Sequence, residues 1–451
     1  MLDNTSFLRY IVLMKRDIYQ KLQSWKDSAR RKPLILNGAR QVGKTYALNY
    51  FGAEAYENVV YLNFEKDKSI AAYFESSIEP HRLINFLSLH AKATISPEKT
   101  LLIFDEVQEC PRALNSLKYF CEEANEYHIA GAGSLLGVKT IHTEGFPVGK
   151  VNFLHLYPLN FFEFLSAFGE ERLRLYLEEL THFEPIAIPL HEKLIELLKT
   201  YFYVGGMPEA VSEFSSNRDY SAVREIQLEI LDAYERDFSK HAPQNQFMKI
   251  LTIWQHVHKQ LAKENKKFIF SVIKQSARGR DYEEAIQWLL EAGLIYKCYH
   301  LPTPKLPLTA YSDKNIYKIY LLDVGLLGAQ TNLKPETVIK NNELFTEYKG
   351  ALTENYVAQE LKSTERRDLY YWTSSGTAEV DFIVERAGDI LPLEIKAGTS
   401  DKKKSLLSYA NKYNPPALLR SSLMNLKHDG KLSNYPLYLI GAFESISKAG
   451  E

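Results

Sequence analysis

Short apolar runs alternate with amphipathic stretches through the first third of the chain. The runs LILN, VVYLNFEK, TLLIFDEV and YHIAGAGS lie at residues 34–37, 59–66, 100–107 and 127–134. Each has the length of a buried strand, and helix-forming segments separate them. Ile18, Leu22 and Trp25 form one stripe of a helix expected over residues 14–29. Strands that alternate with helices predict a parallel, doubly wound sheet.

The pattern changes after residue 147. A mostly helical stretch follows over residues 170–263, and residues 268–300 read as two short helices and a strand, which is typical of a winged helix. Further on, the sequence predicts helices over residues 351–362 and 406–413 and strands at residues 369–373, 379–385, 391–396 and 435–441. The expected domains are residues 14–165, 166–330 and 331–451.

Composition narrows the class of protein without identifying it. At 451 residues the chain is too long for one ordinary core, and its 45% hydrophobic and 25% charged residues are typical of a globular protein. The net charge of −1 gives no global attraction to nucleic acid, so a DNA contact would need a local patch. No apolar stretch approaches the roughly 20 residues of a membrane span. Three cysteines without metal-ligand spacing fit a reducing cytoplasm.

The segment GARQVGKT matches the phosphate-loop pattern G-x-x-x-x-G-K-[ST], with an apolar strand before it and a helix-forming run after it. Glycines let such a loop turn tightly and direct its N–H groups at phosphate oxygens, and the helix N-terminus adds its dipole. Lys44 would reach the β- and γ-phosphates, and the Thr45 hydroxyl would bind Mg²⁺. The predicted ATP-binding residues are Gly38, Ala39, Arg40, Gln41, Val42, Gly43, Lys44, Thr45 and Tyr46.

The run LLIFDE supplies the acidic partner of this loop. Asp105, at the end of a strand, is placed to hold Mg²⁺ directly or through water, and Glu106 to polarise the attacking water. Ser134, after the fourth apolar run, is a weaker candidate for contact with the γ-phosphate or the water, because Gly-Ser is also common turn chemistry. The predicted catalytic residues are therefore Lys44, Glu106 and Ser134, and the cofactors are ATP and Mg²⁺.

The motifs resemble those of the AAA-like ATPases that carry a C-terminal DUF4143 region. The resemblance rests on GARQVGKT, LLIFDEVQ, AGAGSLL, YPLNFFEFL, YVGGMPEAV, IYLLDVGLL, GALTENYVAQEL and EVDFIV with LEIKAG. It runs from about residue 15 to about residue 440. Members of that family commonly begin near MKRDIYQKL, which makes Met14 an alternative start to Met1. Gly149-Lys150 stands where the family usually has Gly-Arg, so a γ-phosphate sensor here would act as a point charge.

A second group of acids lies late in the chain. Glu354 on a helix, Asp381 on a strand and Glu394 with Lys396 on the next strand resemble the PD-(D/E)XK nuclease pattern. Two carboxylates would hold Mg²⁺, and a lysine would orient or activate water. Glu394 and Lys396 are two residues apart and therefore share a strand face. An exposed polar edge of a sheet would explain each of these acids, or the acid-x-lysine pair, taken alone. A nuclease-like fold also does not establish nuclease activity. We expect the three acids to converge beside Lys396 in a restriction-endonuclease-like α/β domain.

Two functions remain open from the sequence. The first is an ATP-dependent DNA-processing or defence protein, in which Lys274, Arg278 and Arg280 of the winged helix are candidate phosphate contacts. An interdomain packing module is an equally open reading of that segment. The second is a regulatory ATPase switch that binds protein partners, with the nuclease-like domain as an inactive scaffold. A metabolic kinase is disfavoured, because the Asp-Glu pair suits water activation and no acceptor domain is apparent. The oligomeric state and the source of any arginine finger stay open.

Overall fold

The computed structural model describes residues 14–133, 147–261, 268, 279–339, 346–364, 368–398 and 403–446. The chain divides into two compact units. The N-terminal unit comprises residues 16–157 with the short turn at 291–293. The C-terminal unit comprises the described residues of 158–290 and 294–446, together with Met14 and Lys15.

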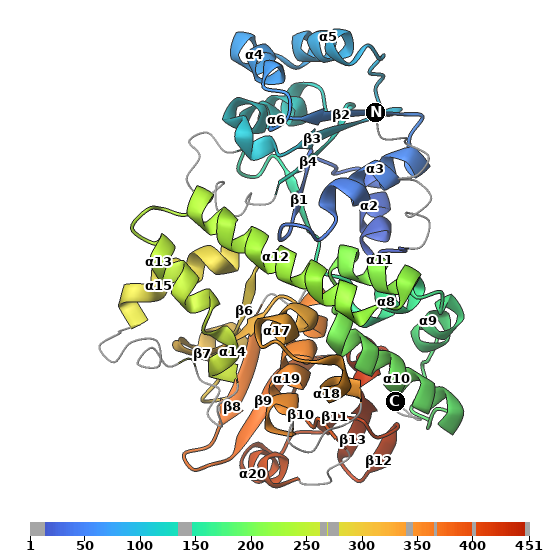
Figure 1. Cartoon of the computed structure of the whole chain (residues 1–451), viewed down its shortest axis with the longest axis vertical. Coiled ribbons are helices and arrows are strands. Elements are labelled where there is room, and N and C mark those ends of the chain that lie inside the picture. The colour runs from blue at the N-terminus through green and yellow to red at the C-terminus, as the bar shows by residue number, and fades with distance from the viewer. Residues whose placement is uncertain are drawn as a thin grey trace. The chain divides into compact units, whose positions relative to one another are not determined.

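A five-stranded parallel sheet forms the centre of the N-terminal unit (Figure 1). Its strands are β1 (Leu34–Asn37), β2 (Asn58–Asn63), β3 (Thr100–Asp105), β4 (His128–Ala132) and β5 (Asn152–His155). The order across the sheet is β2-β3-β4-β1-β5, and every adjacent pair is parallel. The predicted P-loop type of parallel sheet is therefore confirmed, and β5 is a strand that the sequence pattern did not indicate.

Helices cover both faces of this sheet. They are α2 (Ile18–Asp27), α3 (Lys44–Ala55), α4 (Ser69–Ser76), α5 (Pro80–Ala91) and α6 (Pro111–Glu123), with the 3-10 turn η1 (Val107–Glu109). Ile18, Leu22 and Trp25 are buried, as the predicted stripe requires. Alternate strand residues such as Val60 and Phe104 pack in one core with α4, α5 and α6. On the α3 side the helix approaches closely at Gly52, where an added Cβ would lie 2.6 Å from the Val59 side chain.

The first half of the C-terminal unit is helical, as predicted. Its helices are α8 (Phe161–Ala167), α9 (Glu171–Glu178), α10 (Ile188–Val204), α11 (Pro208–Asn217), α12 (Tyr220–His241), α13 (Phe247–Trp254), α14 (Val257–Leu261) and α15 (Gly279–Glu291). A capping box begins α8, because Asn160 accepts from the Glu163 N–H and Glu163 accepts from the Asn160 N–H.

An eight-stranded mixed sheet forms the rest of this unit. Its strands are β6 (Ile295–His300), β7 (Asp313–Leu321), β8 (Leu369–Thr373), β9 (Glu379–Arg386), β10 (Asp389–Ile395), β11 (Leu418–Ser422), β12 (Lys427–Asp429) and β13 (Leu432–Pro436). Their order is β12-β13-β11-β10-β9-β8-β6-β7. The accompanying helices are α16 (Leu308–Tyr311), α17 (Val324–Gln330), α18 (Pro335–Ile339), α19 (Thr346–Ser363) and α20 (Lys404–Tyr413).

The sheet corrects the domain boundary expected between residues 330 and 331. Strand β6 pairs with β8 in parallel and with β7 in antiparallel orientation, so two strands before residue 330 belong to the same sheet as the strands after it. Residues 166–330 and 331–451 therefore share one core. The periodicity of each segment indicates its own secondary structure, but it does not tell which strand becomes its neighbour.

Two local predictions also change. Residues 435–441 were expected to form a strand, whereas β13 ends at Pro436 and the 3-10 helix η4 (Leu437–Ala442) follows it. In the expected winged helix, α15 and β6 occupy the positions of the second helix and the strand, and the first helix lies outside the described residues. Because β6 is an inner strand of the large sheet, it is no isolated wing.

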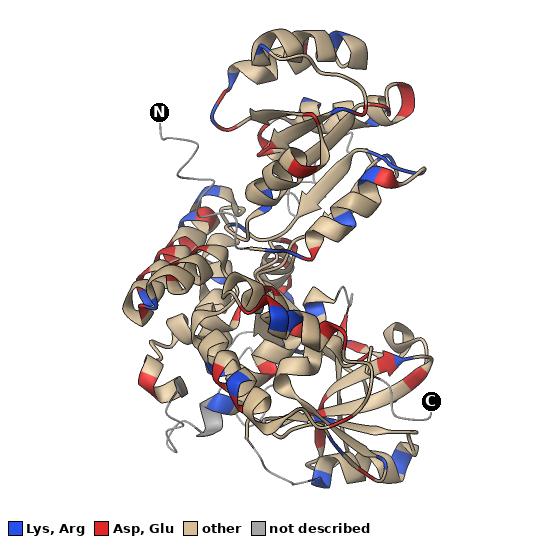
Figure 2. Ribbon diagram, turned by 90° about the vertical axis from the view of Figure 1, so that its right-hand side faces the viewer, with Lys and Arg blue, Asp and Glu red and all other residues tan. Residues whose placement is uncertain are grey.

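Charged residues of both signs are interspersed over each unit (Figure 2). This distribution accords with the net charge of −1. Within the described residues, no helix is both long and apolar enough to cross a bilayer.

Candidate functional site

The segment 38–45 forms a tight loop between β1 and α3 at the carboxyl edge of the parallel sheet. Gly38 has φ +150° and Gly43 has φ +93°, and Gln41 also has positive φ, at +64°. A Cβ added to Gly38 would lie 2.3 Å from the Leu156 carbonyl oxygen, so no larger residue fits there without a backbone shift. Gly43 is the N-cap of α3. The loop thus has the backbone form that places a helix N-terminus at an anion.

Lys44 is buried inside this loop. Its Nζ donates to the carbonyl oxygens of Gly38 at 2.9 Å and Ala39 at 2.7 Å. Burial is the main cause that lowers the pKa of Lys44 to about 8, and the carboxylates of Glu106 and Asp105 act in the opposite direction. The lysine is therefore a buried cation held by its own loop, beside the acids that the sequence assigned to the same site.

Thr45 and Asp105 meet across the edge of the sheet. The Thr45 hydroxyl donates to Asp105 Oδ1 at 3.0 Å, although 60 residues separate the two positions. A hydroxyl and a carboxylate at this distance offer the oxygen ligands that Mg²⁺ prefers. The residues present therefore fit the metal that the sequence predicts for this position.

Tyr61 and Asn63 hold the Asp105 carboxylate from the neighbouring strand β2. The Tyr61 hydroxyl donates to Asp105 Oδ2 at 2.5 Å, and Asn63 Nδ2 donates to the same oxygen at 3.1 Å. Asn63 and Asp105 are register partners in the parallel pair β2–β3. Neither residue belongs to a motif that the sequence indicated. The strand run VVYLN carried a detectable signal, because polar residues at a strand end face the same sheet edge as Asp105.

Glu106 lies directly after β3 in a left-handed backbone conformation, with φ +49°. Such a conformation is unfavourable for a residue other than glycine, and the fold must hold it in place. Gln108 Nε2 donates to Glu106 Oε2, which fixes the direction of the carboxylate. Gln108 is, after Tyr61 and Asn63, a third positioning residue that the sequence pattern did not indicate.

The structure also places other residues that the sequence predicted for this site. Val42 is buried, its carbonyl accepts from Arg16 Nη1 at 3.2 Å, and Arg40 is exposed. Tyr46 stacks on Tyr50, with ring centroids 6.2 Å apart. Ser134 lies outside the described residues, so its predicted role stays a prediction.

Lys150, at the position where the resembled family usually has arginine, pairs with a carboxylate on α6. Its Nζ lies 2.8 Å from Glu122 Oε1. The hydrogen bond to Glu122 raises the pKa of Lys150. Lys150 therefore remains a cation, and it is paired within the protein.

Of the four residues of the predicted nuclease-like site, Glu354 lies on α19, Asp381 on β9 and Glu394 on β10, and Lys396 directly follows β10. Asp381 Oδ2 accepts from the Ile395 N–H at 2.7 Å, and the Lys396 ammonium pairs with Glu394. Glu354 accepts from the Tyr320 hydroxyl at 3.2 Å. Within the described residues, no three His, Cys, Asp or Glu side chains are grouped so as to hold a metal ion. The expected convergence of the three carboxylates into a metal cluster is therefore absent from this structure.

Lys318 on β7, which the sequence analysis did not select, lies among these acids. Its side chain is 0% exposed, and its Nζ lies 2.5 Å from Glu379 Oε1 and 3.7 Å from Glu354 Oε2. Burial acts to lower the pKa of Lys318, but Glu354, Glu379 and Asp381 outweigh burial and raise it above its usual range. A protonated lysine thus supplies the positive charge that a metal ion would bring to these carboxylates.

Of the three candidate phosphate contacts in the expected winged helix, the structure describes Arg280. Lys274 and Arg278 lie outside the described residues. Arg280 is exposed at the start of α15, with its Nε 3.8 Å from Asp281 Oδ1.

Three family models match separate segments of the chain. Residues 30–165 match an AAA domain, residues 195–337 match a domain of unknown function (DUF8612), and residues 349–438 match a domain of unknown function (DUF4143). The AAA domain and the DUF4143 region are therefore both present, in agreement with the resemblance of the motifs. A comparison with curated proteins found no significant match.

The solved structures that match the chain share little sequence with it. The Walker-type ATPase PABY2304 of Pyrococcus abyssi is 14% identical, with a TM-score of 0.45, over 70% of this chain and 96% of that one. AMPPCP-bound DnaA from Aquifex aeolicus is 15% identical, with a TM-score of 0.26, over 60% and 74% of the two chains. The Aeropyrum pernix ORC1 protein in complex with DNA is 12% identical, with a TM-score of 0.27, over 72% and 91%.

Proposed function

We propose that this protein binds and hydrolyses Mg·ATP in the loop between β1 and α3. The observation that carries the proposal is the meeting of Thr45 and Asp105 at 3.0 Å beside the buried ammonium of Lys44. Two oxygen ligands and a cation are thereby placed next to a helix N-terminus. These are the groups that bind a nucleoside triphosphate and its metal ion.

Each residue then has a distinct role. The loop N–H groups between Gly38 and Thr45 bind phosphate oxygens, and Lys44 leaves its loop carbonyls to bind the β- and γ-phosphates. Thr45 and Asp105 hold Mg²⁺, which neutralises charge on the phosphates when bound. Tyr61 and Asn63 keep the Asp105 carboxylate directed at that position. Glu106, directed by Gln108, orients the attacking water and accepts its proton.

Two substitutions test this assignment. Lys44→Ala removes the cation that faces the phosphates, so we expect ATP affinity to fall by at least about tenfold, with exposed Lys66→Ala as the matched control. Glu106→Gln keeps the metal ligands and loses the base, so ATP should bind normally and be hydrolysed about a hundredfold more slowly or worse. Glu123→Gln, an exposed change on α6, is its control. Normal turnover in the Glu106→Gln protein would remove Glu106 from the role.

The use of this ATPase has two competing proposals, and one observation favours the second. In the DNA-processing or defence proposal, the late acids hold a catalytic metal in a nuclease-like domain. In the other proposal, a regulatory ATPase switch binds protein partners and that domain is a scaffold. The charge of Lys318 among Glu354, Glu379 and Asp381 favours the scaffold, because the carboxylates already have a cation.

Two assays decide between these uses. ATP hydrolysis is measured with and without single- and double-stranded DNA, and Mg²⁺-dependent nicking of a plasmid is measured for the wild-type protein and for Asp381→Asn. The scaffold proposal predicts no nicking by either protein and no stimulation by DNA. Nicking that disappears in Asp381→Asn would establish the nuclease instead.

A further inference from the structure

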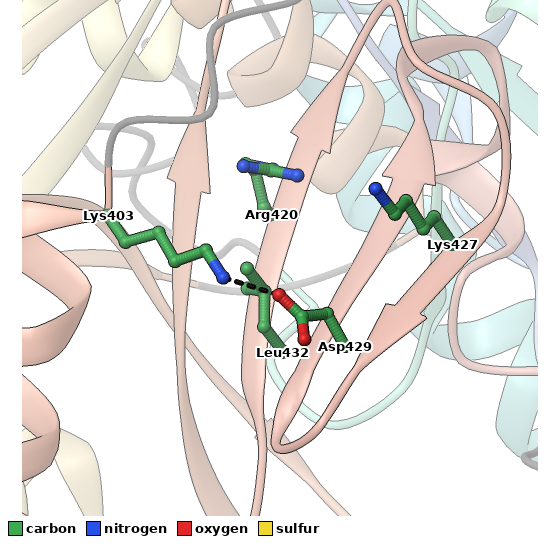
Figure 3. A pocket seen from close by; sticks show the side chains of 5 residues that line it. All are labelled: Lys403, Arg420, Lys427, Asp429 and Leu432. Carbon is green, nitrogen blue, oxygen red and sulfur yellow. Dashed lines mark hydrogen bonds and ion pairs between the residues drawn. The ribbon is translucent and has the colours of Figure 1, made fainter.

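A small basic pocket lies at the end of the eight-stranded sheet that carries β11, β13 and β12 (Figure 3). Its volume is about 250 Å³, and it is lined by Lys403, Arg420, Lys427, Asp429 and Leu432. Three of these side chains are cations and one is a carboxylate. The lining therefore carries a formal charge of about +2 at neutral pH, from three positive groups and one negative group.

Strand register brings these charges together from separate parts of the sequence. Arg420 on β11 is the register partner of Asn434 on β13, and Asn434 is the partner of Lys427 on β12. Lys403 comes from the opposite side, where it is the N-cap residue of α20. No sequence motif indicates that these charged residues come together.

Arg420 forms the rigid base of the pocket. Its side chain is 3% exposed, and its Nε donates to Asn434 Oδ1 at 3.0 Å. Asn434 is held in turn, because it donates to the backbone carbonyls of Met424 and Asn425 and accepts from Ser422. A buried guanidinium whose orientation is fixed by such a network is ready to bind a planar or tetrahedral oxyanion without losing further conformational freedom.

Lys403 and Asp429 form an ion pair at the side of the pocket, and an incoming anion can break this pair. Their ion pair spans 2.5 Å, with side-chain exposures of 35% and 63% (Figure 3). An exposed pair of this kind is weak and is screened by salt. A more highly charged anion that enters between Lys403, Lys427 and Arg420 can therefore displace the single carboxylate of Asp429.

The size and the lining indicate the chemical class of the ligand. Since a water molecule takes up about 30 Å³ in the liquid, the pocket has room for a few small oxygen-rich groups. Leu432 is the apolar lining residue, and no aromatic ring is among the lining residues that the structure describes. A nucleobase would have nothing on which to stack. We propose that the pocket binds a phosphoryl group, supplied either by free phosphate or pyrophosphate or by the backbone of a nucleic acid.

The experiment measures binding of pyrophosphate by titration calorimetry to the full chain. It uses the Lys44→Ala background, so that the phosphate loop contributes little. We expect the double change Lys403→Met with Lys427→Met to lower the affinity by at least about tenfold, because charge-assisted bonds are lost. Lys334→Met, at an exposed lysine of the same unit, is the control. Equal affinity in the double variant and the control would overturn the proposal.

A second variant protects the test against simple loss of structure. Asp429→Asn removes the carboxylate that competes for Lys403, so pyrophosphate affinity should rise severalfold. Asp389→Asn, at an exposed position of the same sheet, removes the same charge away from the pocket and should leave the affinity unchanged. An equal change in both would mean that the effect is only net charge, and the pocket would be rejected.

A final comparison identifies the source of the phosphoryl group. The same proteins are titrated with a 5′-phosphorylated single-stranded oligonucleotide of about 12 nucleotides. Binding that depends on Lys403 and Lys427 supports the nucleic-acid backbone as the ligand. If only pyrophosphate binding depends on Lys403 and Lys427, free phosphate or pyrophosphate is the ligand. If neither oligonucleotide binding nor pyrophosphate binding changes when both lysines are replaced, the proposed site is overturned. The pocket does not depend on ATP hydrolysis, so failure here leaves the proposed ATPase intact.

Discussion

Asp323 Oδ2 accepts a hydrogen bond of 2.6 Å from the backbone N–H of Gly206, a residue 117 positions earlier in the chain. Burial raises the pKa of Asp323 to about 6. Hydrogen bonds act in the opposite direction and come from the backbone N–H groups of Gly206, Leu326 and Gly325 and from the Gln359 side chain. Two of the resembled motifs, YVGGMPEAV and IYLLDVGLL, are thus joined by one buried carboxyl group. This contact serves the packing of the C-terminal unit.

Gly206 provides a sharp test of this packing role. A Cβ added there would lie 2.1 Å from the Leu159 carbonyl oxygen, which is backbone and cannot rotate away. We expect Gly206→Ala to destabilise the C-terminal unit by more than about 4 kcal/mol, measured as loss of its thermal transition by circular dichroism.

Gly350 is the matched control for that substitution. It lies within α19, and a Cβ added there meets nothing within 4 Å. Gly350→Ala should therefore stabilise the helix by up to about 1 kcal/mol. A Gly206→Ala protein that melts at the wild-type temperature would show that the junction between the two motifs can relax.

The pKa of Lys44 predicts how nucleotide affinity depends on pH. Burial lowers that pKa to about 8, so the ammonium is present below pH 8 and is lost as the pH rises through 8. Bound phosphates favour the charged form and raise the pKa, so ADP binding takes up a proton above pH 8. We expect ADP affinity to be nearly constant from pH 6.5 to 7.5 and then to fall by up to about tenfold per pH unit.

Titration calorimetry in buffers of different ionisation enthalpy measures this proton uptake. Lys44→Arg serves as the control, because arginine stays protonated throughout this range. Its ADP affinity, whatever its absolute value, should lose the dependence above pH 8. A wild-type affinity that is flat to pH 9.5 would contradict a lowered pKa for Lys44.

The sequence predicted those parts of the fold and of the site whose residues are close together in the chain. The loop from Gly38 to Thr45 and the two acids at the end of β3 were predicted, because a strand, a loop and a helix start make a local pattern. Tyr61, Asn63 and Gln108 were not, since their roles come from the contacts they make with Asp105 and Glu106. Lys318 was missed for a similar reason, as its acids lie 36 to 63 residues further along the chain, at positions 354, 379 and 381.

Strand order accounts for the largest error. The sequence placed a domain boundary near residue 330, but β6 and β7 complete a sheet whose other strands come after residue 368. Hydrophobic periodicity predicts which face of a strand is buried, but it does not predict which strands pair with it.

This sheet order predicts the behaviour of fragments. A fragment of residues 14–330 keeps β6 and β7 without β8 and exposes the unpaired edge of β6, so we expect it to aggregate. A fragment of residues 14–157 contains all five strands of the parallel sheet and the whole Thr45–Asp105 site, and it should be soluble and bind ATP. Gel filtration and nucleotide titration measure both properties. A soluble, monomeric 14–330 fragment would show that β6 and β7 do not need the later strands.

Lys318 gives the decisive test of the late acidic site. Lys318→Met keeps the length of the side chain and removes the ammonium, which leaves the buried Glu354 and the partly exposed Glu379 without their cation. Removing one partner of a buried ion pair typically costs about 3–5 kcal/mol, so the melting temperature should fall clearly. The variant should then recover part of its stability in millimolar Mg²⁺ or Mn²⁺, because a divalent ion can replace the lost positive charge.

Lys396→Met separates this effect from a general response to metal ions. The Lys396 side chain is 27% exposed and pairs with Glu394, so its removal leaves the acids around Lys318 neutralised. We expect a smaller fall in melting temperature and no rescue by divalent ions. Rescue of Lys318→Met alone would establish that the lysine occupies the role of a metal ion in an otherwise nuclease-like set of acids. Rescue of neither variant would mean that these carboxylates cannot form a metal site even when the competing cation is removed, and equal rescue of both would show that Lys318 has no special place among them.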